Sequence, residues 1–341
     1  MSKTLCWALG FAAALTLAAA CSRTQATADA GEYMKILNVS YDVSRDFYKE
    51  YNPLFVREFK KIRPDIDLHI QQSHGGSSKQ AMSVANGLPA DVVTMNQTSD
   101  IDTLAQRGLV ASDWADSLPN QAVPFSSATV FLVRKGNPKD ITDWHVLADS
   151  DVKVVFANPK TSGNGRYAFL SLYGYALKTY GSQTEAETFT RKVLANVPMF
   201  ENGSRAASTS FTQREIGDVL VTLENEANFI SRNLLPDQFE IVYPSYTAEA
   251  ESPVAVVESV TAKKGTREAA RAYLQYLWSD PAQELAAKMY FRPGNAEILA
   301  RHRTDFPKLN TFRPNETLGS WPEIMTNFFA DGGIFDRLNT R

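Results

Sequence analysis

The sequence has almost no cysteine. Its 341 residues include only Cys6 and Cys21, so the chain beyond position 21 can form neither a disulfide framework nor a cysteine-based metal site. A large excess of charge is also missing, because 35 basic and 38 acidic side chains leave a formal net charge of −3. That balance argues against a broad electrostatic interaction with nucleic acid. With 44% hydrophobic and 21% charged residues, the composition is typical of a folded globular protein.

Several catalytic and cofactor motifs are absent too. The four histidines lack metal-ligand spacing, and there is no H-E-x-x-H, no G-x-S-x-G and no G-x-x-x-x-G-K-[ST]. No G-x-G-x-x-G follows a predicted strand. The sequence therefore gives no support to a zinc hydrolase, a serine hydrolase or a nucleotide-binding enzyme. After residue 30 it contains no repeat and no apolar run long enough to span a membrane.

The first 20 residues are typical of an export signal. Lys3 precedes an uncharged run at 7–20, which is shorter than the roughly 20 residues that cross a bilayer. We predict a signal peptide over 1–20 and a flexible tether over 21–32. Residues 18–21 (AAAC) are similar to a lipobox, so Cys21 is either a lipidated first residue or is removed by cleavage at an A-x-A site such as 26–28. Both alternatives place the protein in the periplasm.

Strand and helix patterns alternate along the rest of the chain, which predicts an α/β fold. Helical stripes end at the expected stops Gly87 and Gly181, and another helix is expected over 266–278. The Pro/Ser-rich segments 118–127 and 243–253 indicate two crossings between lobes. We expect lobe 1 at 33–120 plus 250–318, lobe 2 at 121–249, and a C-terminal helical segment at 319–341, with a ligand between the lobes. Strands are expected at 36–41, 68–71, 92–95, 129–134, 152–157, 218–223, 239–243 and 254–260.

Three turns rich in glycine and serine are candidate anion sites. They cover 72–80, 158–166 and 202–210, and each opens a predicted helix. The first turn of a helix has N–H groups without partners and a partial positive charge, and glycine allows close approach to them. Such a turn can hold an anion without lysine or arginine, although helix capping is its ordinary role. Three turns converging from two lobes would enclose a small oxyanion.

Polar residues near these turns each have two interpretations. His74 either contacts a ligand or stabilises its turn. Arg166 and Arg205 either face the anion or pair with Asp and Glu, and we favour the pairing. Asp42 either donates its backbone N–H to a ligand with its carboxylate turned away, or it caps the following helix.

The sequence resembles the bacterial sulfate- and thiosulfate-binding proteins, the receptors of ATP-driven sulfate importers. The matching stretches span nearly the whole chain after residue 35: NVSYD (38–42), QSHGGSSKQ (72–80), ADVVT (90–94), FLVRKGNP (131–138), NPKTSGNGR (158–166), GDVL (217–220), ENEA (224–227) and ADGG (330–333). The resemblance implies a two-lobed periplasmic-binding-protein fold of type II that closes on its anion. It also implies a monomer that delivers sulfate or thiosulfate to the permease of an ABC importer, with no cofactor, no nucleic acid partner and no catalysis.

The resemblance further implies the ligand contacts. In the family, a dehydrated sulfate is held by backbone N–H groups at helix starts, by a serine hydroxyl and often by a tryptophan indole. The matching N–H donors here are Asp42, Ser77, Gly163, Asn164 and Ser204, and the matching hydroxyl is that of Ser162.

Two positions depart from the family's pattern. Asn164 stands where sulfate specialists often have glycine, and Leu223 stands where the tryptophan would be. We hypothesise that the apolar Leu223 leaves room for the larger sulfur of thiosulfate while sulfate still binds. The segments 161–164 (TSGN), 96–97 (NQ) and 320–323 (SWPE) are similar to the thiosulfate-binding branch.

Other classes of function remain as alternatives. An exported hydrolase of sulfate or phosphate esters would use the same anion site, and a scaffold that binds a partner protein would need no ion at all. Among receptors, molybdate and phosphate are alternative ligands. Phosphate is disfavoured because it carries a proton at neutral pH. A site made only of donors leaves that proton unpaired, at a cost of about 1–3 kcal/mol.

Overall fold

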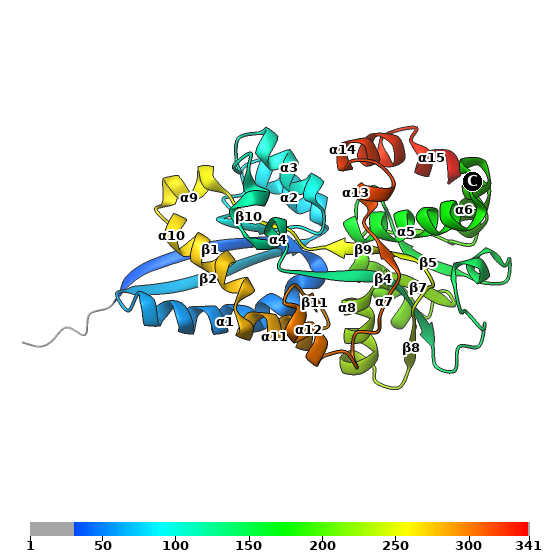
Figure 1. Ribbon diagram of the computed structural model, residues 1–341, viewed down its shortest axis with the longest axis horizontal. Coiled ribbons are helices and arrows are strands. Elements are labelled where there is room, and N and C mark those ends of the chain that lie inside the picture. The colour runs from blue at the N-terminus through cyan, green and yellow to red at the C-terminus, as the bar shows by residue number, and fades with distance from the viewer. Residues whose placement is uncertain (1–30, 340–341) are drawn as a thin grey trace, which may run out of the picture.

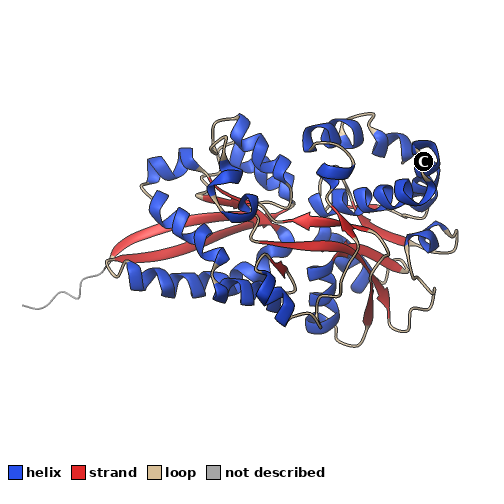
Figure 2. Cartoon of the chain, viewed as in Figure 1, coloured by secondary structure: helices blue, strands red, loops and turns tan. Residues whose placement is uncertain are grey.

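The computed structural model describes residues 31–339. The predicted signal peptide, Cys21, the alternative cleavage site and the tether up to residue 30 lie outside this range, as do residues 340–341. Two lobes lie next to each other along the long axis of the molecule (Figure 1), and in each lobe helices cover both faces of a sheet (Figure 2). Within residues 31–339, no helix has the length and apolar composition needed to cross a membrane.

The first lobe contains a mainly parallel sheet. β1 pairs in parallel with β2 and β3, and β10 joins β3 as an antiparallel edge. Its strands are β1 (Glu32–Tyr41), β2 (Ile66–Gly75), β3 (Val92–Thr94) and β10 (Val254–Val256). Its helices are α1 (Arg45–Ile62), α2 (Ser77–Ala85), α3 (Thr98–Gln106), α9 (Glu258–Lys264), α10 (Arg267–Gln275) and α11 (Asp280–Lys288). An aromatic stripe on α1 packs into the core at helical spacing, with Phe47, Tyr51, Phe55 and Phe59 all buried.

The second lobe contains a mixed sheet. β5 pairs in parallel with both β6 and β7, and β4 pairs antiparallel with β7, β8 and β9. Its strands are β4 (Phe125–Arg134), β5 (Val154–Ala157), β6 (Phe200–Glu201), β7 (Val219–Leu223), β8 (Phe239–Val242), β9 (Thr247–Glu251), β11 (Arg292–Pro293) and β12 (Thr311–Phe312). Its helices are α5 (Gly163–Tyr180), α6 (Gln183–Ala195), α7 (Ser204–Thr212) and α8 (Glu224–Phe229), with the short α4 (Pro119–Ala122) and α12 (Ala296–Arg301) near the crossings.

Strands run through both predicted lobe crossings. Residues 125–127 belong to β4 and residues 247–251 to β9, and Ser126 pairs with Glu251 between them. Figure 1 shows these two strands running side by side from the first lobe into the second. The lobes are therefore joined by a hydrogen-bonded ribbon, although the Pro/Ser composition of the crossings had indicated only that they are not helical.

The C-terminal part of the chain returns to the second lobe. β12 pairs in parallel with β9, and α13 (Pro314–Thr317) contacts α5. Residues 311–318, which we expected in the first lobe, thus lie against the second sheet. The last helices, α14 (Trp321–Ile324) and α15 (Ile334–Leu338), follow them, and α14 also contacts α3 of the first lobe.

Candidate functional site

The parallel strands of the two sheets end where the lobes meet. In the second lobe the register places Ala157 of β5 beside Glu201 of β6, and Val155 beside Leu220 of β7, so these three strands end at one edge of the sheet. In the first lobe, β1, β2 and β3 end together in the same way. Such carboxyl ends are the usual place for a ligand in open α/β sheets. The residues that follow the strands include Asp42, Ser77, Asn96, Ser162 and Ser204, and Leu223 is the last residue of β7.

Five of the seven predicted site residues lie at the first or second position of a helix. Asp42 begins a 3₁₀ turn (Asp42–Ser44) that continues into α1, and Ser77 begins α2. Gly163 and Asn164 begin α5, and Ser204 begins α7. These are the positions whose backbone N–H groups have no partner within the helix.

The three turns lie close together where the lobes meet. A Cβ on Gly76 would lie 2.8 Å from the carbonyl oxygen of Thr161, and the side-chain amide of Gln97 donates to the carbonyl of Gly163 at 3.3 Å. Within the second lobe, the hydroxyls of Ser162 and Ser204 lie 3.5 Å apart. The turns at 77, 163 and 204 therefore share one place between the lobes.

The carboxylate of Asp42 contacts the other lobe. Its Oδ2 accepts the backbone N–H of Arg205 at 3.5 Å, and donation of its own backbone N–H to a ligand stays a prediction. Burial raises the pKa of this carboxyl, and the Arg205 N–H partly offsets the shift. Asp42 thus contributes to the capping of α7 across the interface.

The two arginines pair with carboxylates, as we favoured. Arg205 lies 3.1 Å from Asp46 and 3.7 Å from Glu226. Arg166 is only 4% exposed and lies 3.8 Å from Asp100 across the interface. The positive charges of Arg166 and Arg205 are therefore balanced by protein carboxylates.

Gly163 is required by a contact between the lobes that the sequence does not reveal. We expected the absence of a side chain to let an anion reach the backbone. In the structure, a Cβ at this position would overlap the side-chain amide of Asn96, which also bonds Asn164 at 2.7 Å. Asn96 and Gln97 follow β3 in the same way that Asp42 follows β1. Their position directly after a predicted strand could have identified them as candidate site residues.

Two further predicted residues have their side chains occupied by the protein. The Ser77 hydroxyl donates to Asp100 at 2.5 Å and accepts the backbone N–H of Asn96, so only its backbone N–H is left to serve a ligand. His74 bonds Ser40 through Nδ1 and Gln72 through Nε2, which is the turn-stabilising alternative. Burial lowers the pKa of His74 to about 4, so the ring is neutral near pH 7.

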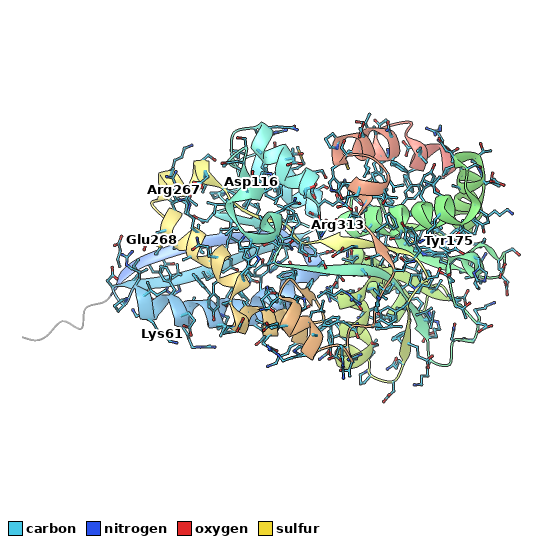
Figure 3. The ribbon with its side chains drawn as sticks, viewed as in Figure 1. Lys61, Asp116, Tyr175, Arg267, Glu268 and Arg313 are labelled. Atoms are coloured by element: carbon cyan, nitrogen blue, oxygen red, sulfur yellow. The ribbon has the colours of Figure 1, made fainter. Side chains whose placement is uncertain are left out.

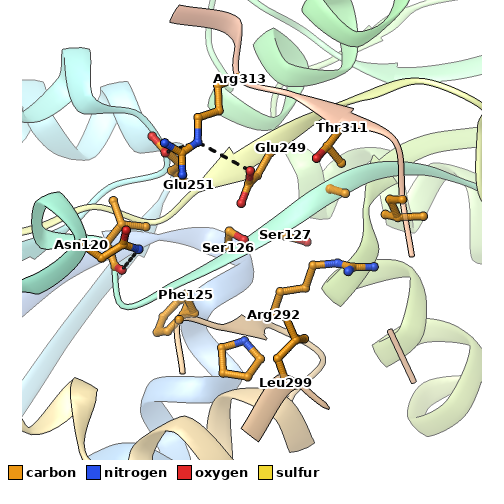
Figure 4. A pocket seen from close by; sticks show the side chains of 15 residues that line it. Asn120, Phe125, Ser126, Ser127, Glu249, Glu251, Arg292, Leu299, Thr311 and Arg313 are labelled. Carbon is orange, nitrogen blue, oxygen red and sulfur yellow. Dashed lines mark hydrogen bonds and ion pairs between the residues drawn. The ribbon is translucent and has the colours of Figure 1, made fainter. Parts of the chain in front are cut away.

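A separate cavity of about 210 Å³ opens beside the connecting strands (Figure 4). Arg313 points toward Glu249 and Glu251 there, at 3.7 and 3.4 Å. Both arginines that line this cavity, Arg292 and Arg313, are already paired with carboxylates, so the cavity is unsuitable for a dianion. Its lining contains none of the predicted site residues. Other charged side chains, such as Lys61, Arg267 and Glu268, point outward at the end of the first lobe remote from the second (Figure 3).

Residues 40–292 match the family model described as bacterial extracellular solute-binding protein. This segment includes every predicted site residue. The chain belongs to that family.

Relatives of this solute-binding protein carry more specific names. It is 56% identical over 304 residues to the thiosulfate-binding protein of Pseudomonas aeruginosa, covering 89% of this chain and 91% of that one. It is 44% identical over 317 residues to the sulfate-binding protein of Escherichia coli, covering 93% and 96%. A solved structure, the sulfate-binding protein SubI from Mycobacterium tuberculosis, superposes with a TM-score of 0.78 at 29% identity, over 87% of this chain and 99% of that chain. The predicted two-lobed, type II fold is confirmed.

Leu223 lies at the same sheet edge as Ser162 and Ser204, the second-lobe site residues of this solute-binding protein. It ends β7, is 1% exposed, and belongs to the main hydrophobic core. Its place beside the end of β5 agrees with an apolar wall for the site, and its contact with a ligand stays a prediction.

Proposed function

We propose that this protein is a periplasmic receptor that binds sulfate and thiosulfate and delivers them, as a monomer, to the permease of an ABC importer. The observation that carries the proposal is that helix starts from the two lobes meet. Gly76, before α2, lies against Thr161, before α5, and Asp42 contacts the start of α7, while the Ser162 and Ser204 hydroxyls lie 3.5 Å apart. The names of the relatives support the same ligands.

Neutral hydrogen-bond donors suit a fully ionised anion, because such an anion has no proton that needs an acceptor. The charges of Arg166 and Arg205 are balanced by carboxylates, so the anion would be held by peptide N–H groups and a hydroxyl. The Ser162 hydroxyl contacts a backbone N–H and another serine hydroxyl, and neither group can remove its proton. Ser162 is therefore a hydrogen-bond donor rather than an activated nucleophile, which favours a receptor over an exported hydrolase.

Calorimetric titration with sulfate, thiosulfate, phosphate and molybdate tests this proposal. We expect sulfate and thiosulfate to bind and phosphate to bind at least tenfold more weakly, since its proton would be unpaired. Ligand at 100 times its Kd should also stabilise the fold by about 2.7 kcal/mol. Failure of both sulfate and thiosulfate to bind would overturn the proposal. Tight sulfate binding with no thiosulfate binding would overturn only the role given to Leu223.

Substituting Ser162→Ala should lower the affinity for sulfate roughly 10- to 150-fold, because hydrogen bonds to charged groups contribute about 1.5–3 kcal/mol. The substitution also removes the cap of α5, since Ser162 accepts the Gly165 N–H, and this loss costs about 0.5–2 kcal/mol of folding stability. Ser182→Ala is the matched control, because Ser182 caps α6 in the same way through the Glu185 N–H. The control should lose stability but keep its affinity. Unchanged affinity in Ser162→Ala would remove this hydroxyl from the site.

The export signal also stays a proposal. Mass spectrometry of the N-terminal peptide of the exported protein distinguishes a lipidated Cys21 from cleavage near residue 28.

A further inference from the structure

Two asparagine side chains lie buried where the lobes meet. Asn96 follows β3 of the first lobe and is 1% exposed, and Asn164 is at the second position of α5 in the second lobe and is 5% exposed. Asn96 Nδ2 donates to Asn164 Oδ1 at 2.7 Å. This single bond leaves Asn96 Oδ1 and Asn164 Nδ2 buried without a hydrogen-bond partner.

The position of Gly163 fixes the orientation of this amide pair. The direction that a Cβ of Gly163 would take leads straight onto Asn96 Oδ1, so this oxygen faces a Cα–H of the glycine. A carbonyl oxygen accepts a weak Cα–H bond there, whereas an amide NH₂ would be repelled. Reversing both amides is therefore disfavoured. The group that still needs a partner is the NH₂ of Asn164.

An unpartnered donor in such a place points to a ligand. Leaving a buried N–H unpaired is costly, and native structures nearly always satisfy such groups. Asn164 follows Gly163 and Ser162 at the start of α5, within the turn whose N–H groups and hydroxyl serve the proposed anion. The anion is the acceptor that would complete the hydrogen bonding of this side chain.

We propose that Asn164 binds the anion through its side-chain amide as well as its backbone N–H. This inference rests on the proposed function. Leu223, buried in the apolar core at the end of β7, offers the anion no polar partner on its side of the site. The terminal sulfur of thiosulfate, a larger atom and a weaker acceptor than oxygen, would lie on that side.

A double-mutant cycle separates this role from a purely structural one. Asn164→Ala removes the donor, but it also deprives Asn96 of its partner. The substitution is therefore made in both the wild-type and the Asn96→Ala backgrounds, and sulfate and thiosulfate are titrated into all four proteins. We expect Asn164→Ala to weaken the binding of both anions about 10- to 100-fold in each background. If it has no effect once Asn96 is alanine, the side chain serves only Asn96 and the proposal is wrong.

Thermal unfolding gives a second readout. Without anion, Asn164→Ala in the Asn96→Ala background should unfold at the same temperature or higher, since it loses an unpaired buried donor. The rise produced by sulfate should become smaller in the same protein. An unchanged sulfate-induced rise would contradict the proposal, and wild-type protein that binds neither anion would instead contradict the proposed function.

Discussion

Replacing Gly163 with alanine is expected to lower the affinity for sulfate and thiosulfate roughly 30- to 1000-fold. The added Cβ would overlap the amide of Asn96, so the lobes could approach only if that side chain moved away. Overpacking costs about 1–3 kcal/mol, and the buried bond between Asn96 and Asn164 would be lost as well. Calorimetry measures the loss. The unliganded protein should unfold normally, because the overlap arises only between the lobes.

Gly203→Ala is the matched control. Gly203 lies in another anion turn of the same lobe, but a Cβ there would meet only Asp42 Oδ2 at an ordinary 3.6 Å. Its affinity should fall less than that of Gly163→Ala, because no protein side chain would be displaced. Adding Asn96→Ala to Gly163→Ala should restore part of the affinity by removing the group that the new methyl meets. Equal losses in the two glycine variants, or no rescue by the second substitution, would show that lobe contact at Gly163 is not the cause.

The local elements of the fold could be predicted because their signals are local. The β-branched run at 92–95 became β3, and the helix expected to end at Gly181 does so, with that glycine at a φ of +79°. Two-residue strands such as β6 and β12 have no such signal, because pairing with distant segments creates them. The position of residues 311–318 depends on the ring of Phe312, which fills the space left by Gly174 on α5. In the sequence, Gly174 is a glycine within a predicted helix, and nothing there indicates which side chain packs against it.

For the candidate site too, some residues could be predicted from local sequence signals and others could not. The helix starts at 77, 163 and 204 follow from the composition of their turns, and Asp42 was a candidate because it follows the first predicted strand. Asn96 and Gln97 act on residues 68 and 66 positions away in the other lobe. No periodicity or spacing links such pairs, because the contact exists only when both lobes are folded and face each other. The capping of α7 by Asp42 was missed for the same reason.

Arg166→Met is expected to lower anion affinity about 150- to 5000-fold. Arg166 belongs to the second lobe, where its Nε donates to the carbonyl of Pro159. Its Nη1 reaches the first lobe, donating to Ser78 at 2.5 Å and Gln97 at 2.7 Å, and it lies 3.8 Å from Asp100. Methionine keeps much of the volume but leaves the Asp100 carboxylate buried without a cation. Breaking a buried pair in this way costs about 3–5 kcal/mol.

This cost should fall on the closed protein, because separation of the lobes returns the Asp100 carboxylate to water. Calorimetry with sulfate should therefore show the full loss, while unfolding without ligand changes little. Adding Asp100→Asn removes the unpaired charge and should recover most of the affinity. Arg63→Met is the control, since Arg63 pairs with Asp65 and Glu268 on the exposed surface of the first lobe, and it should change affinity less than threefold. A double variant as weak as Arg166→Met alone would show that the arginine stabilises closure through its bonds to Ser78 and Gln97 rather than through its charge.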